Sequence, residues 1–295
     1  MGQRFEVVLV TYRSRALAEA LLERLPAQTP VVLVDNAKGV DGVQDLVAGR
    51  PHTRYLEGPG EGFARGANLG ARTSSAEYVI FVNPDSAPTI DQLETLVDDL
   101  ASDAHLVAVG ATTVQPDGRV EIGVGGWEPT PWRCLVHALG LHSHWRTAGV
   151  YARPEPGVPL ELDWLSGACM AVPRQDFLDL GGFDERYFVY NEDMAFGRRA
   201  RAAGRGLRLR TDMLVPHLGG GSGEAKPRMF QMRGASMTKY LSEHHGRGET
   251  LLMRAALTLS TVIRATQARV TRRSDLARAH GAYLKGLWRG APDMT

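Results

Sequence analysis

EYVIFVNPDSAP, the stretch Glu77–Pro88, has five consecutive apolar residues that end abruptly at Asn83-Pro84-Asp85. A short apolar run bounded by turn residues is typical of a strand that is buried on both faces of a parallel sheet. Ligands of such sheets bind beyond the carboxyl ends of the strands, so we expect Asp85 at the ligand edge. Its carboxylate suits Mg²⁺ or Mn²⁺ bound to a diphosphate. The alternative is a helix N-cap, for which Ser86, Thr89 and Asp91 are also available.

The sequence on both sides of this stretch alternates short apolar runs with helical patterns, which is typical of βαβ units. We predict strands over 7–10, 31–34, 53–56, 78–82 and 106–111, and helices over 15–25, 62–73 and 91–101. Residues 115–163 are rich in Gly, Pro and Trp and are predicted to be irregular. Beyond them we predict a strand-like run through Gly167, helices over 174–180 and from Glu192 onward, and a last strand over 207–217. The prediction is an α/β fold with a mostly parallel central sheet flanked by helices.

Composition and charge narrow the range of functions that this protein could have. The formal net charge of the 295-residue chain is +1, which argues against a nucleic-acid-binding protein. Cys134 and Cys169 are far apart and lack metal-ligand spacing, which favours a reducing compartment. The apolar run Val7–Val10 is too short for a signal peptide, and no run reaches the roughly 18 residues of a membrane span. We therefore expect a cytoplasmic protein that binds no nucleic acid.

The C-terminal region differs from the rest in composition. Residues 226–295 are helical in pattern, rich in Arg and poor in acids, so we predict a catalytic domain over 1–225 and a basic helical region over 226–295. Two interpretations of this region remain open. The helices pack on the domain or in a homodimer interface, or their basic face contacts anionic lipid on the inner face of the plasma membrane.

Two adjacent acids, Glu192 and Asp193, follow a run of aromatic residues and open a predicted helix. Acids in a first helical turn often do no more than complement the helix dipole. Here the neighbouring aromatic side chains would partly desolvate the pair, and like charges in a desolvated site raise a carboxyl pKa. This pattern favours a general base.

Other polar residues also follow predicted strands. His217 ends the last strand and precedes a glycine loop, where an imidazole could bind a metal ion and the loop a phosphate. Asp35 and Asn36 end the second strand, where a carboxylate could accept a hydrogen bond from a uracil or thymine. The helix that begins after Gly62 carries Arg65 and Asn68 and could bind an anion at its N-terminus. The dinucleotide fingerprint fails because position 65 is not glycine, and the P-loop motif is absent.

Together these stretches resemble the family 2 glycosyltransferases of GT-A fold, most closely their rhamnosyltransferase-like branch. The resemblance runs from about residue 5 to 225 and is carried by Val10-Thr11-Tyr12, Val34-Asp35-Asn36, Gly62-Phe63-Ala64 with Asn68 and Gly70, Asn83-Pro84-Asp85, Asp163-Trp164 with Ser166-Gly167-Ala168, Gly181–Glu185, Asn191-Glu192-Asp193 and His217. The family's usual Asp-x-Asp metal motif has Asn83 in its first position here, as in the rhamnosyl-type branch.

The resemblance implies an inverting, metal-dependent transfer of a sugar from a nucleotide-diphospho-sugar, with L-rhamnose from dTDP-rhamnose as the first expectation. Asp193 is implied as the general base, helped by Glu192, and Asp85 and His217 as ligands of Mg²⁺ or Mn²⁺. The nucleotide-sugar-binding residues are expected to be Thr11, Tyr12, Asp35, Asn36, Gly62, Phe63, Arg65, Asn68, Asn83, Asp85, Trp164, Ser166 and Gly167.

Several alternatives remain at this point. The acceptor is a glycan, a polyprenyl-diphosphate-linked sugar or a small molecule, and the donor could instead carry UDP. A nucleotide-sugar-binding protein without turnover is a second class of function. A nucleotidyltransferase is a third, although Arg13 and Arg15 are only a faint trace of the basic triphosphate loop that it needs.

Overall fold

Residues 4–217 and 226–292 are described by the structure, a computed structural model. The chain divides into two compact units. The first contains residues 1–125, 154–188 and 192–222, and the second contains residues 126–153, 189–191 and 223–295. In the described part of the chain, no helix combines the length and the apolar character that crossing a membrane requires.

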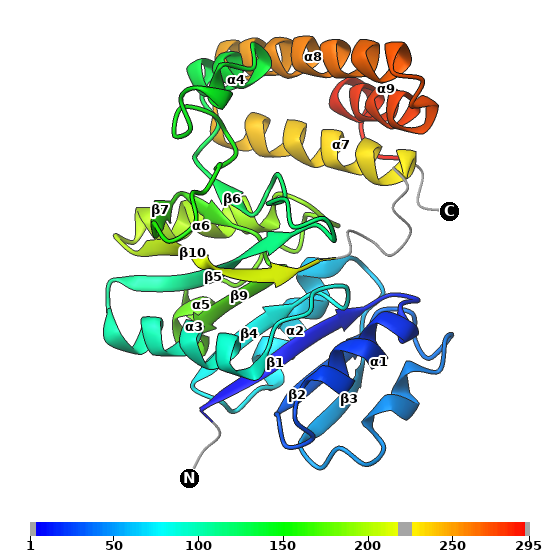
Figure 1. The fold of residues 1–295 in the computed structure, drawn as a ribbon, viewed down its shortest axis with the longest axis vertical. Coiled ribbons are helices and arrows are strands. Elements are labelled where there is room, and N and C mark those ends of the chain that lie inside the picture. Colours follow the sequence, from blue (N-terminus) through cyan, green and yellow to red (C-terminus); the bar gives the residue numbers. More distant parts are fainter. Residues whose placement is uncertain (1–3, 218–225, 293–295) are drawn as a thin grey trace. The chain divides into compact units, whose positions relative to one another are not determined.

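The first unit is built on an eight-stranded, mostly parallel sheet in the order β3-β2-β1-β4-β9-β5-β10-β7 (Figure 1). Its strands are β1 (Phe5–Thr11), β2 (Val31–Asp35), β3 (Thr53–Glu57), β4 (Tyr78–Val82), β5 (Leu106–Val114), β7 (Leu160–Leu162), β9 (Cys169–Pro173) and β10 (Gly206–Pro216). Strand β9 runs antiparallel between β4 and β5, and β7 runs antiparallel to β10 at one edge. Two short strands, β6 (Gly125–Gly126) and β8 (Trp164–Leu165), lie outside this sheet.

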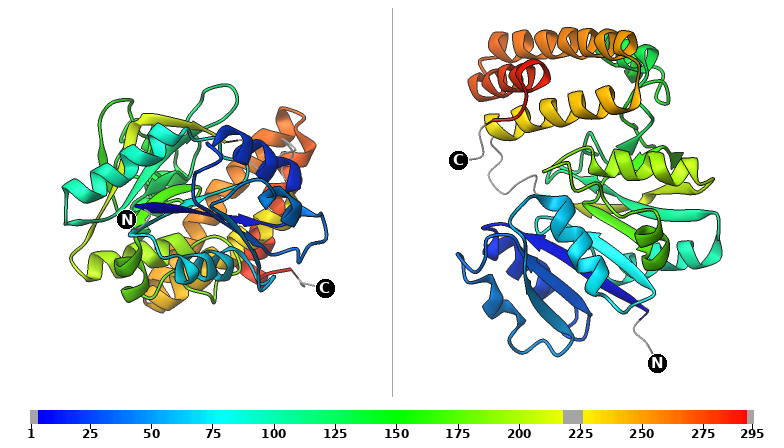
Figure 2. Two further views of the ribbon diagram at one scale, coloured as in Figure 1. Left: turned by 90° about the horizontal axis from the view of Figure 1, so that it is seen from below. Right: turned by 180° about the vertical axis from the view of Figure 1, so that it is seen from behind.

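Helices cover both faces of the sheet (Figures 1 and 2). They are α1 (Arg15–Arg24), α2 (Phe63–Thr73), α3 (Ile90–Ser102), α5 (Arg174–Asp179) and α6 (Glu192–Ala202), with a short 3₁₀ helix, η1 (Val43–Val47). Alternate residues of a strand point to opposite faces. Leu9, Leu33 and Ile80 therefore join α1 and α3 in one core, whereas Phe81 faces Phe177 of α5, with ring centroids 5.0 Å apart. Each such buried side chain stabilises the fold by about 1.5–3 kcal/mol.

The glycines of α2 allow it to pack closely on β1. A Cβ atom at Gly70 would overlap the side chain of Val8, and one at Gly66 would lie 2.9 Å from the side chain of Val10. Close packing of α2 on β1 is therefore the role that the structure gives these two glycines.

The sequence prediction needs two corrections. The strand-like run through Gly167 is interrupted, because β8 ends at Leu165 and β9 begins at Cys169, with a turn between them. Residues 115–163 are not irregular throughout. They contain α4 (Pro131–Ala138), which begins with Pro131 behind the N-cap Thr130, a standard start for a helix.

The second unit is helical. It contains α4, a 3₁₀ turn η2 (Leu141–Ser143), and three longer helices, α7 (Pro227–His244), α8 (Arg247–Val270) and α9 (Ser274–Arg289). Helices α7 and α9 approach closely because Gly234 and Gly286 meet backbone across the interface, where a Cβ atom would overlap a carbonyl oxygen of the facing helix. Tyr240 is buried and donates a hydrogen bond to Glu128, 2.8 Å away. These contacts give the helical unit a core of its own.

Candidate functional site

The carboxyl ends of the parallel strands meet at one edge of the sheet. Thr11 of β1 lies opposite Asp35 of β2, and Leu9 lies opposite Val82 of β4. Because β9 is antiparallel, it begins at this edge, with Cys169 opposite Val82. The edge therefore gathers the polar residues that follow β1, β2 and β4 with the turn that precedes β9.

Asp85 and His217 are brought together at this edge. The Nε2 atom of His217 lies 3.1 Å from the Oδ1 atom of Asp85, and both side chains are largely buried. The backbone fixes the pair from both sides, since His217 donates its N–H to Val114 at 2.9 Å and Ala87 donates to Pro216 at 2.9 Å. The two side chains come from the ends of β4 and β10, which are far apart in sequence. The glycine loop that was predicted to bind phosphate, residues 218–223, lies outside the described residues.

The structure argues against the N-cap interpretation of Asp85. Helix α3 is capped by Thr89, whose hydroxyl accepts a hydrogen bond from the backbone of Gln92, while the Gln92 side chain accepts from the backbone of Thr89. This reciprocal capping box satisfies the start of the helix without Asp85. The Asp85 carboxylate instead faces His217.

Glu121 is a site residue that the sequence analysis missed. Its Oε2 atom lies 2.7 Å from the Nδ1 atom of His217 and also accepts a hydrogen bond from the hydroxyl of Thr113 at 2.9 Å. A tight turn, Gln115–Arg119, folds the chain back after β5 and places Glu121 beside Thr113. The Pro-Asp-Gly sequence within this turn is a known turn signal and could have revealed the hairpin.

His217 is held between two carboxylates. Burial alone would lower the pKa of the imidazole, but hydrogen bonds to Asp85 and Glu121 outweigh burial and raise the pKa to about 9. Imidazole and carboxylate are both ligands for divalent metal ions, and a carboxylate on the second ring nitrogen is the usual way to orient a metal-binding histidine. Asp85 and His217 therefore fit a divalent ion. Residues 4–217 and 226–292 contain no group of three acidic, His or Cys side chains arranged to hold one.

The turn before β9 is tied to the Asp85 segment. The carbonyl oxygen of Ala168 accepts hydrogen bonds from the backbone of Asn83 at 2.9 Å and from the hydroxyl of Ser86 at 3.0 Å. A Cβ atom added at Gly167 would lie 3.2 Å from the ring of Phe63, so a larger residue at this position would press on the start of α2. The predicted residues Asn83, Ser166 and Gly167 thus lie in two linked turns, while the side chain of Trp164 is buried at 4% exposure.

Glu192 and Asp193 begin α6, and their surroundings differ. Glu192 is buried at 5% exposure, whereas Asp193 is half-buried and accepts a hydrogen bond from the backbone of Met194 at 2.8 Å. Tyr190 and Asn191, just before them, both have left-handed backbone conformations, with φ of 68° and 69°. Such strain in non-glycine residues is concentrated at functional sites.

The pKa of Glu192 is raised well above its usual value, first by burial and then by the charge of Asp193. Its Oε2 atom has no hydrogen-bond partner among the described residues, which fits a carboxyl group that stays protonated. The negative charge of the pair therefore resides on Asp193. When two neighbouring acids lie in such different environments, their pKa values differ and they take different roles.

Replacing Glu192 by Gln is expected to stabilise the protein at pH 8 and to change little near pH 4.5. Above the pKa of an unfolded Glu, about 4.3, the unfolded chain loses a proton that the folded protein keeps, so parent stability falls as pH rises toward the raised folded pKa. A tenfold difference between the folded and unfolded acid dissociation constants corresponds to about 1.4 kcal/mol of unfolding free energy. Urea unfolding at both pH values measures the difference, and Glu94→Gln, an exposed residue of α3, is the matched control. An equal effect of Glu192→Gln at both pH values would contradict the assignment.

The residues predicted to bind the nucleoside lie after β1 and β2. Asp35 is fully buried, and its carboxylate accepts hydrogen bonds from the backbone of Ala37 and Gly39 and from the hydroxyl of Tyr55. The side-chain amide of Asn36 donates to the carbonyl of Gly62 at 2.8 Å. Two further predicted residues adjoin them: Thr11 is buried and Tyr12 is 62% exposed.

Residues at the start of α2 form hydrogen bonds and an ion pair with other parts of the protein. Gly62 has φ of +92°, and the backbone N–H of Phe63 donates to the carbonyl of Phe188 at 2.9 Å. Asn68 is buried, donates to the carbonyl of Phe183 and accepts from its N–H, both at 2.8 Å. Arg65 pairs with Glu61 at 2.6 Å. Asn68 thus anchors the loop that precedes α6, and its contact with a nucleoside stays a prediction.

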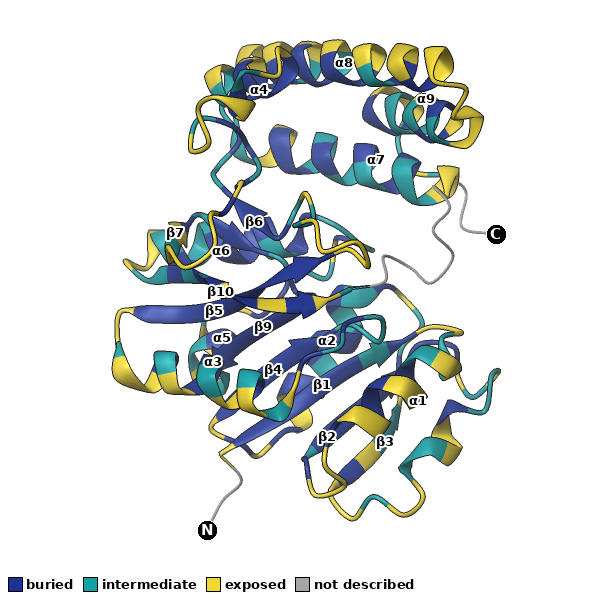
Figure 3. Ribbon diagram, viewed as in Figure 1, coloured by how far each residue is buried: buried dark blue, intermediate teal, exposed yellow. Residues whose placement is uncertain are grey.

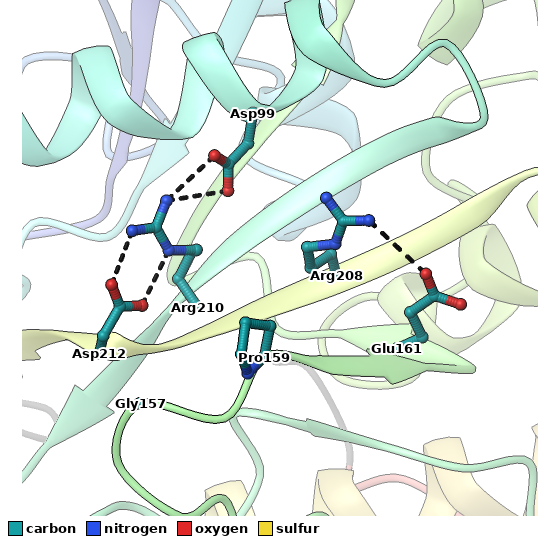
Figure 4. Close-up of a pocket in the computed structure, with 7 residues that line it drawn as sticks. All are labelled: Asp99, Gly157, Pro159, Glu161, Arg208, Arg210 and Asp212. Atoms are coloured by element: carbon teal, nitrogen blue, oxygen red, sulfur yellow. Dashed lines mark hydrogen bonds and ion pairs between the residues drawn. The ribbon is translucent and has the colours of Figure 1, made fainter.

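A separate pocket lies along the first half of β10, next to β7 and α3 (Figure 4). Its two arginines are paired. Arg210 lies 3.0 Å from Asp99 and 2.6 Å from Asp212, and Arg208 lies 2.9 Å from Asp103. Because both positive charges are compensated within the protein, the pocket offers no excess positive charge to an anionic ligand.

Comparisons with known proteins show which proteins this chain is similar to. The model of a family described as Glycosyl transferase family 2 matches residues 6–147. The chain is 33% identical over 218 residues to the N-acetylglucosaminyl-diphospho-decaprenol L-rhamnosyltransferase of Mycobacterium tuberculosis, covering 67% of this chain and 70% of that protein. It is 26% identical over 202 residues to a low-salt glycan biosynthesis hexosyltransferase of Haloferax volcanii, covering 66% and 61% of the two chains.

Two solved structures share the fold. A mannosyltransferase from Pyrobaculum calidifontis, in complex with GDP-Man and Mn²⁺, matches with a TM-score of 0.61 at 18% identity, covering 98% of this chain and 88% of that one. S. aureus TarS, in complex with UDP-GlcNAc, matches with a TM-score of 0.50 at 14% identity, covering 97% and 90%. At these identities the likeness concerns the fold alone, and it confirms the predicted GT-A architecture with helices after the last strand.

Proposed function

The chain belongs to glycosyl transferase family 2 and is a glycosyltransferase. We propose that it transfers L-rhamnose from dTDP-rhamnose to an acceptor hydroxyl, with inversion of the configuration at the anomeric carbon. The observation that carries the proposal is the line of three side chains Asp85, His217 and Glu121 at the carboxyl edge of the sheet. In a sheet of this kind that edge is where a nucleotide binds.

The chemical step needs a base for the acceptor hydroxyl. We assign this role to Asp193, because it is the accessible member of its pair and carries the pair's charge. The hydroxyl oxygen attacks the anomeric carbon as Asp193 takes its proton, and the bond from that carbon to the diphosphate breaks. Attack from the face opposite the leaving group inverts the centre in one step. General base catalysis of this kind contributes typically 10²–10⁴-fold.

Departure of the diphosphate places negative charge near Asp85 and His217. A divalent ion held by these two residues, Mg²⁺ or Mn²⁺, would neutralise charge on the leaving group. Glu121 acts on the same site indirectly, since its carboxylate holds the Nδ1 atom of His217 and turns Nε2 toward Asp85. Asn83 is an amide at the position where the family's usual Asp-x-Asp motif has its first carboxylate, so Asp85 and His217 are the proposed ligand pair.

The donor and acceptor are proposed from the Mycobacterium tuberculosis relative. That protein is named a rhamnosyltransferase acting on N-acetylglucosaminyl-diphospho-decaprenol. We propose a polyprenyl-diphosphate-linked sugar as the acceptor of this chain as well. A UDP-sugar donor is the alternative outcome of the donor test.

The donor test compares dTDP-L-rhamnose, UDP-GlcNAc, UDP-glucose and GDP-mannose with Mn²⁺ and a short-chain N-acetylglucosaminyl-diphospho-lipid. Release of the nucleoside diphosphate and formation of a disaccharide-lipid product are both measured. Turnover only with dTDP-L-rhamnose supports the proposal. Preference for a UDP- or GDP-sugar would overturn the donor assignment, and nucleotide binding without product from any donor would overturn the reaction.

Glu121→Gln is expected to weaken metal binding about 10–100-fold, the usual effect of losing a carboxylate that orients a metal-binding histidine. The activity should return in part at high Mn²⁺ concentration. Titration of Mn²⁺ in the presence of dTDP, followed by electron paramagnetic resonance, measures affinity without turnover. Glu94→Gln removes the same charge from an exposed position of α3 and should bind Mn²⁺ as the parent does. Equal Mn²⁺ affinity in the two variants would show that Glu121 does not position the histidine.

A further inference from the structure

Helix α8 is exposed on one side along most of its length (Figure 3), and the residues on that side are uncharged and largely apolar. Its exposed residues between Glu249 and Arg269 are Leu251, Leu252, Ala255, Leu259, Val262, Ile263, Thr266 and Gln267. Leu252 is 63% exposed and Val262 is 46% exposed. At 1.5 Å per residue this face is about 25 Å long. Continuous apolar surface of this extent on a protein marks an interaction site.

The two arginines within this part of α8 do not interrupt the apolar face. Arg254 lies over the ring of Trp288 in α9, 4.0 Å from its centroid, and donates to the carbonyl of Leu287 at 2.8 Å. Arg264 contacts the Nε2 atom of His137 in α4 at 2.9 Å. Both side chains are therefore engaged with neighbouring helices, and the exposed face stays free of charge.

Helix α4 packs on α8 and adds exposed apolar residues beside it. Trp132 is 59% exposed and Leu139 is 53% exposed, and Trp145 just beyond the helix is 55% exposed. Tryptophan is enriched where proteins meet the headgroup region of a bilayer, because its ring is apolar and its N–H is polar.

Positive charge surrounds this surface. Residues 226–292 contain thirteen Lys and Arg but only three Asp and Glu, although the whole chain has a net charge of +1. Exposed Arg247 marks the beginning of α8, and exposed Arg269, Arg272 and Arg273 mark its end. An apolar helix face with arginines at its ends is typical of helices that lie in the surface of an anionic membrane.

We propose that the outer face of α8, with the exposed residues of α4, docks on an anionic lipid bilayer. A second copy of the chain is a poorer occupant, because it would bring a unit with the same excess of positive charge onto this one. The helix lies on the bilayer and does not cross it. The inference rests on the proposed function for its purpose, since docking would bring the enzyme to a polyprenyl-linked acceptor.

Cosedimentation of the full chain with lipid vesicles tests the proposal. We expect binding to vesicles of phosphatidylglycerol and phosphatidylcholine at low salt, and little binding to phosphatidylcholine alone or at high salt. Removing two charges in Arg272→Gln/Arg273→Gln should weaken binding about 25-fold, since each basic residue near the surface contributes about fivefold.

A matched pair of valine substitutions tests the apolar face. Val262→Glu on α8 should abolish vesicle binding, whereas Val158→Glu, at a similarly exposed position of the first unit, should weaken binding only slightly because Val158 is not part of the docking surface. Thermal melting checks that both variants fold. Equal vesicle binding by the two variants would overturn the proposal. The proposal would also be overturned if the parent chain bound no vesicles but formed a dimer in sedimentation velocity, and Val262→Glu abolished that dimer.

Transfer to a water-soluble acceptor separates this inference from the proposed function. Val262→Glu should retain full transfer to a short-chain acceptor and lose transfer only to an acceptor embedded in vesicles. Full transfer by Val262→Glu to the embedded acceptor would contradict membrane docking. Absence of transfer by the parent chain to either acceptor, with vesicle binding intact, would contradict the proposed function and leave the docking surface supported.

Discussion

Asp193→Asn is expected to reduce sugar transfer by about 10³-fold while leaving the fold and the binding of dTDP-L-rhamnose intact. The amide keeps the shape of the carboxylate and still accepts the hydrogen bond from the backbone of Met194, but it cannot take the proton of the acceptor hydroxyl. The loss should therefore appear in kcat and not in the donor's dissociation constant. Single-turnover kinetics with saturating acceptor, together with calorimetric donor binding, measure the two quantities separately.

Asp193 also lies in the first turn of a helix, so loss of a favourable charge there must be distinguished from loss of a base. Asp91 occupies the first turn of α3 and is exposed, which makes Asp91→Asn the matched control. The dipole contribution of such an acid is about 0.3–1 kcal/mol and concerns stability. Retained activity in Asp193→Asn, or an equal loss in Asp91→Asn, would contradict the assignment of the base.

Asp85→Asn is expected to reduce kcat/KM by about 10²–10³-fold, the range found when one electrostatic contact to a departing charge is removed. The substitution removes the charge that faces His217 and one proposed ligand of the metal ion. Loss of a metal ligand would be recognised because Mn²⁺ should no longer tighten the binding of the donor nucleotide to this variant. Calorimetric titration of dTDP with and without Mn²⁺ measures this without any turnover.

Asp45→Asn is a suitable control because Asp45 is a well-exposed carboxylate of the first unit, with a side chain 70% exposed. It should keep both activity and the Mn²⁺ effect. If Asp85→Asn bound dTDP with the same dependence on Mn²⁺ as the parent, Asp85 would not be a metal ligand. The pairing of Asp85 with His217 would then have only a structural role.

Much of the first unit could be predicted from sequence because its strands and helices are encoded locally. The apolar run before Asn83 is β4, and the helical pattern after Arg15 is α1. The position of β9 could not be predicted in this way. A strand inserted antiparallel between β4 and β5 is specified by contacts with residues distant in sequence, which local periodicity does not contain.

The candidate site, too, could be predicted from the sequence only in part. Asp85 and His217 were predicted to act together from a family resemblance, and the structure places them 3.1 Å apart. Glu121 was missed because its role arises from a hairpin, although the Pro-Asp-Gly turn offered a signal. The sequence suggested that one acid of the Glu192 and Asp193 pair would have a raised pKa, but only burial in the fold reveals that it is Glu192.

The measurement that tests the central proposal most directly is the anomeric configuration of the transferred sugar. The enzyme is incubated with dTDP-L-rhamnose, Mn²⁺ and a short-chain N-acetylglucosaminyl-diphospho-lipid, and the product is analysed by nuclear magnetic resonance. We predict a single rhamnosyl product whose anomeric configuration is opposite to that of the donor and whose formation is lost in Asp193→Asn. A product with retained configuration, or one formed equally well by Asp193→Asn, would contradict direct displacement by a hydroxyl that Asp193 deprotonates.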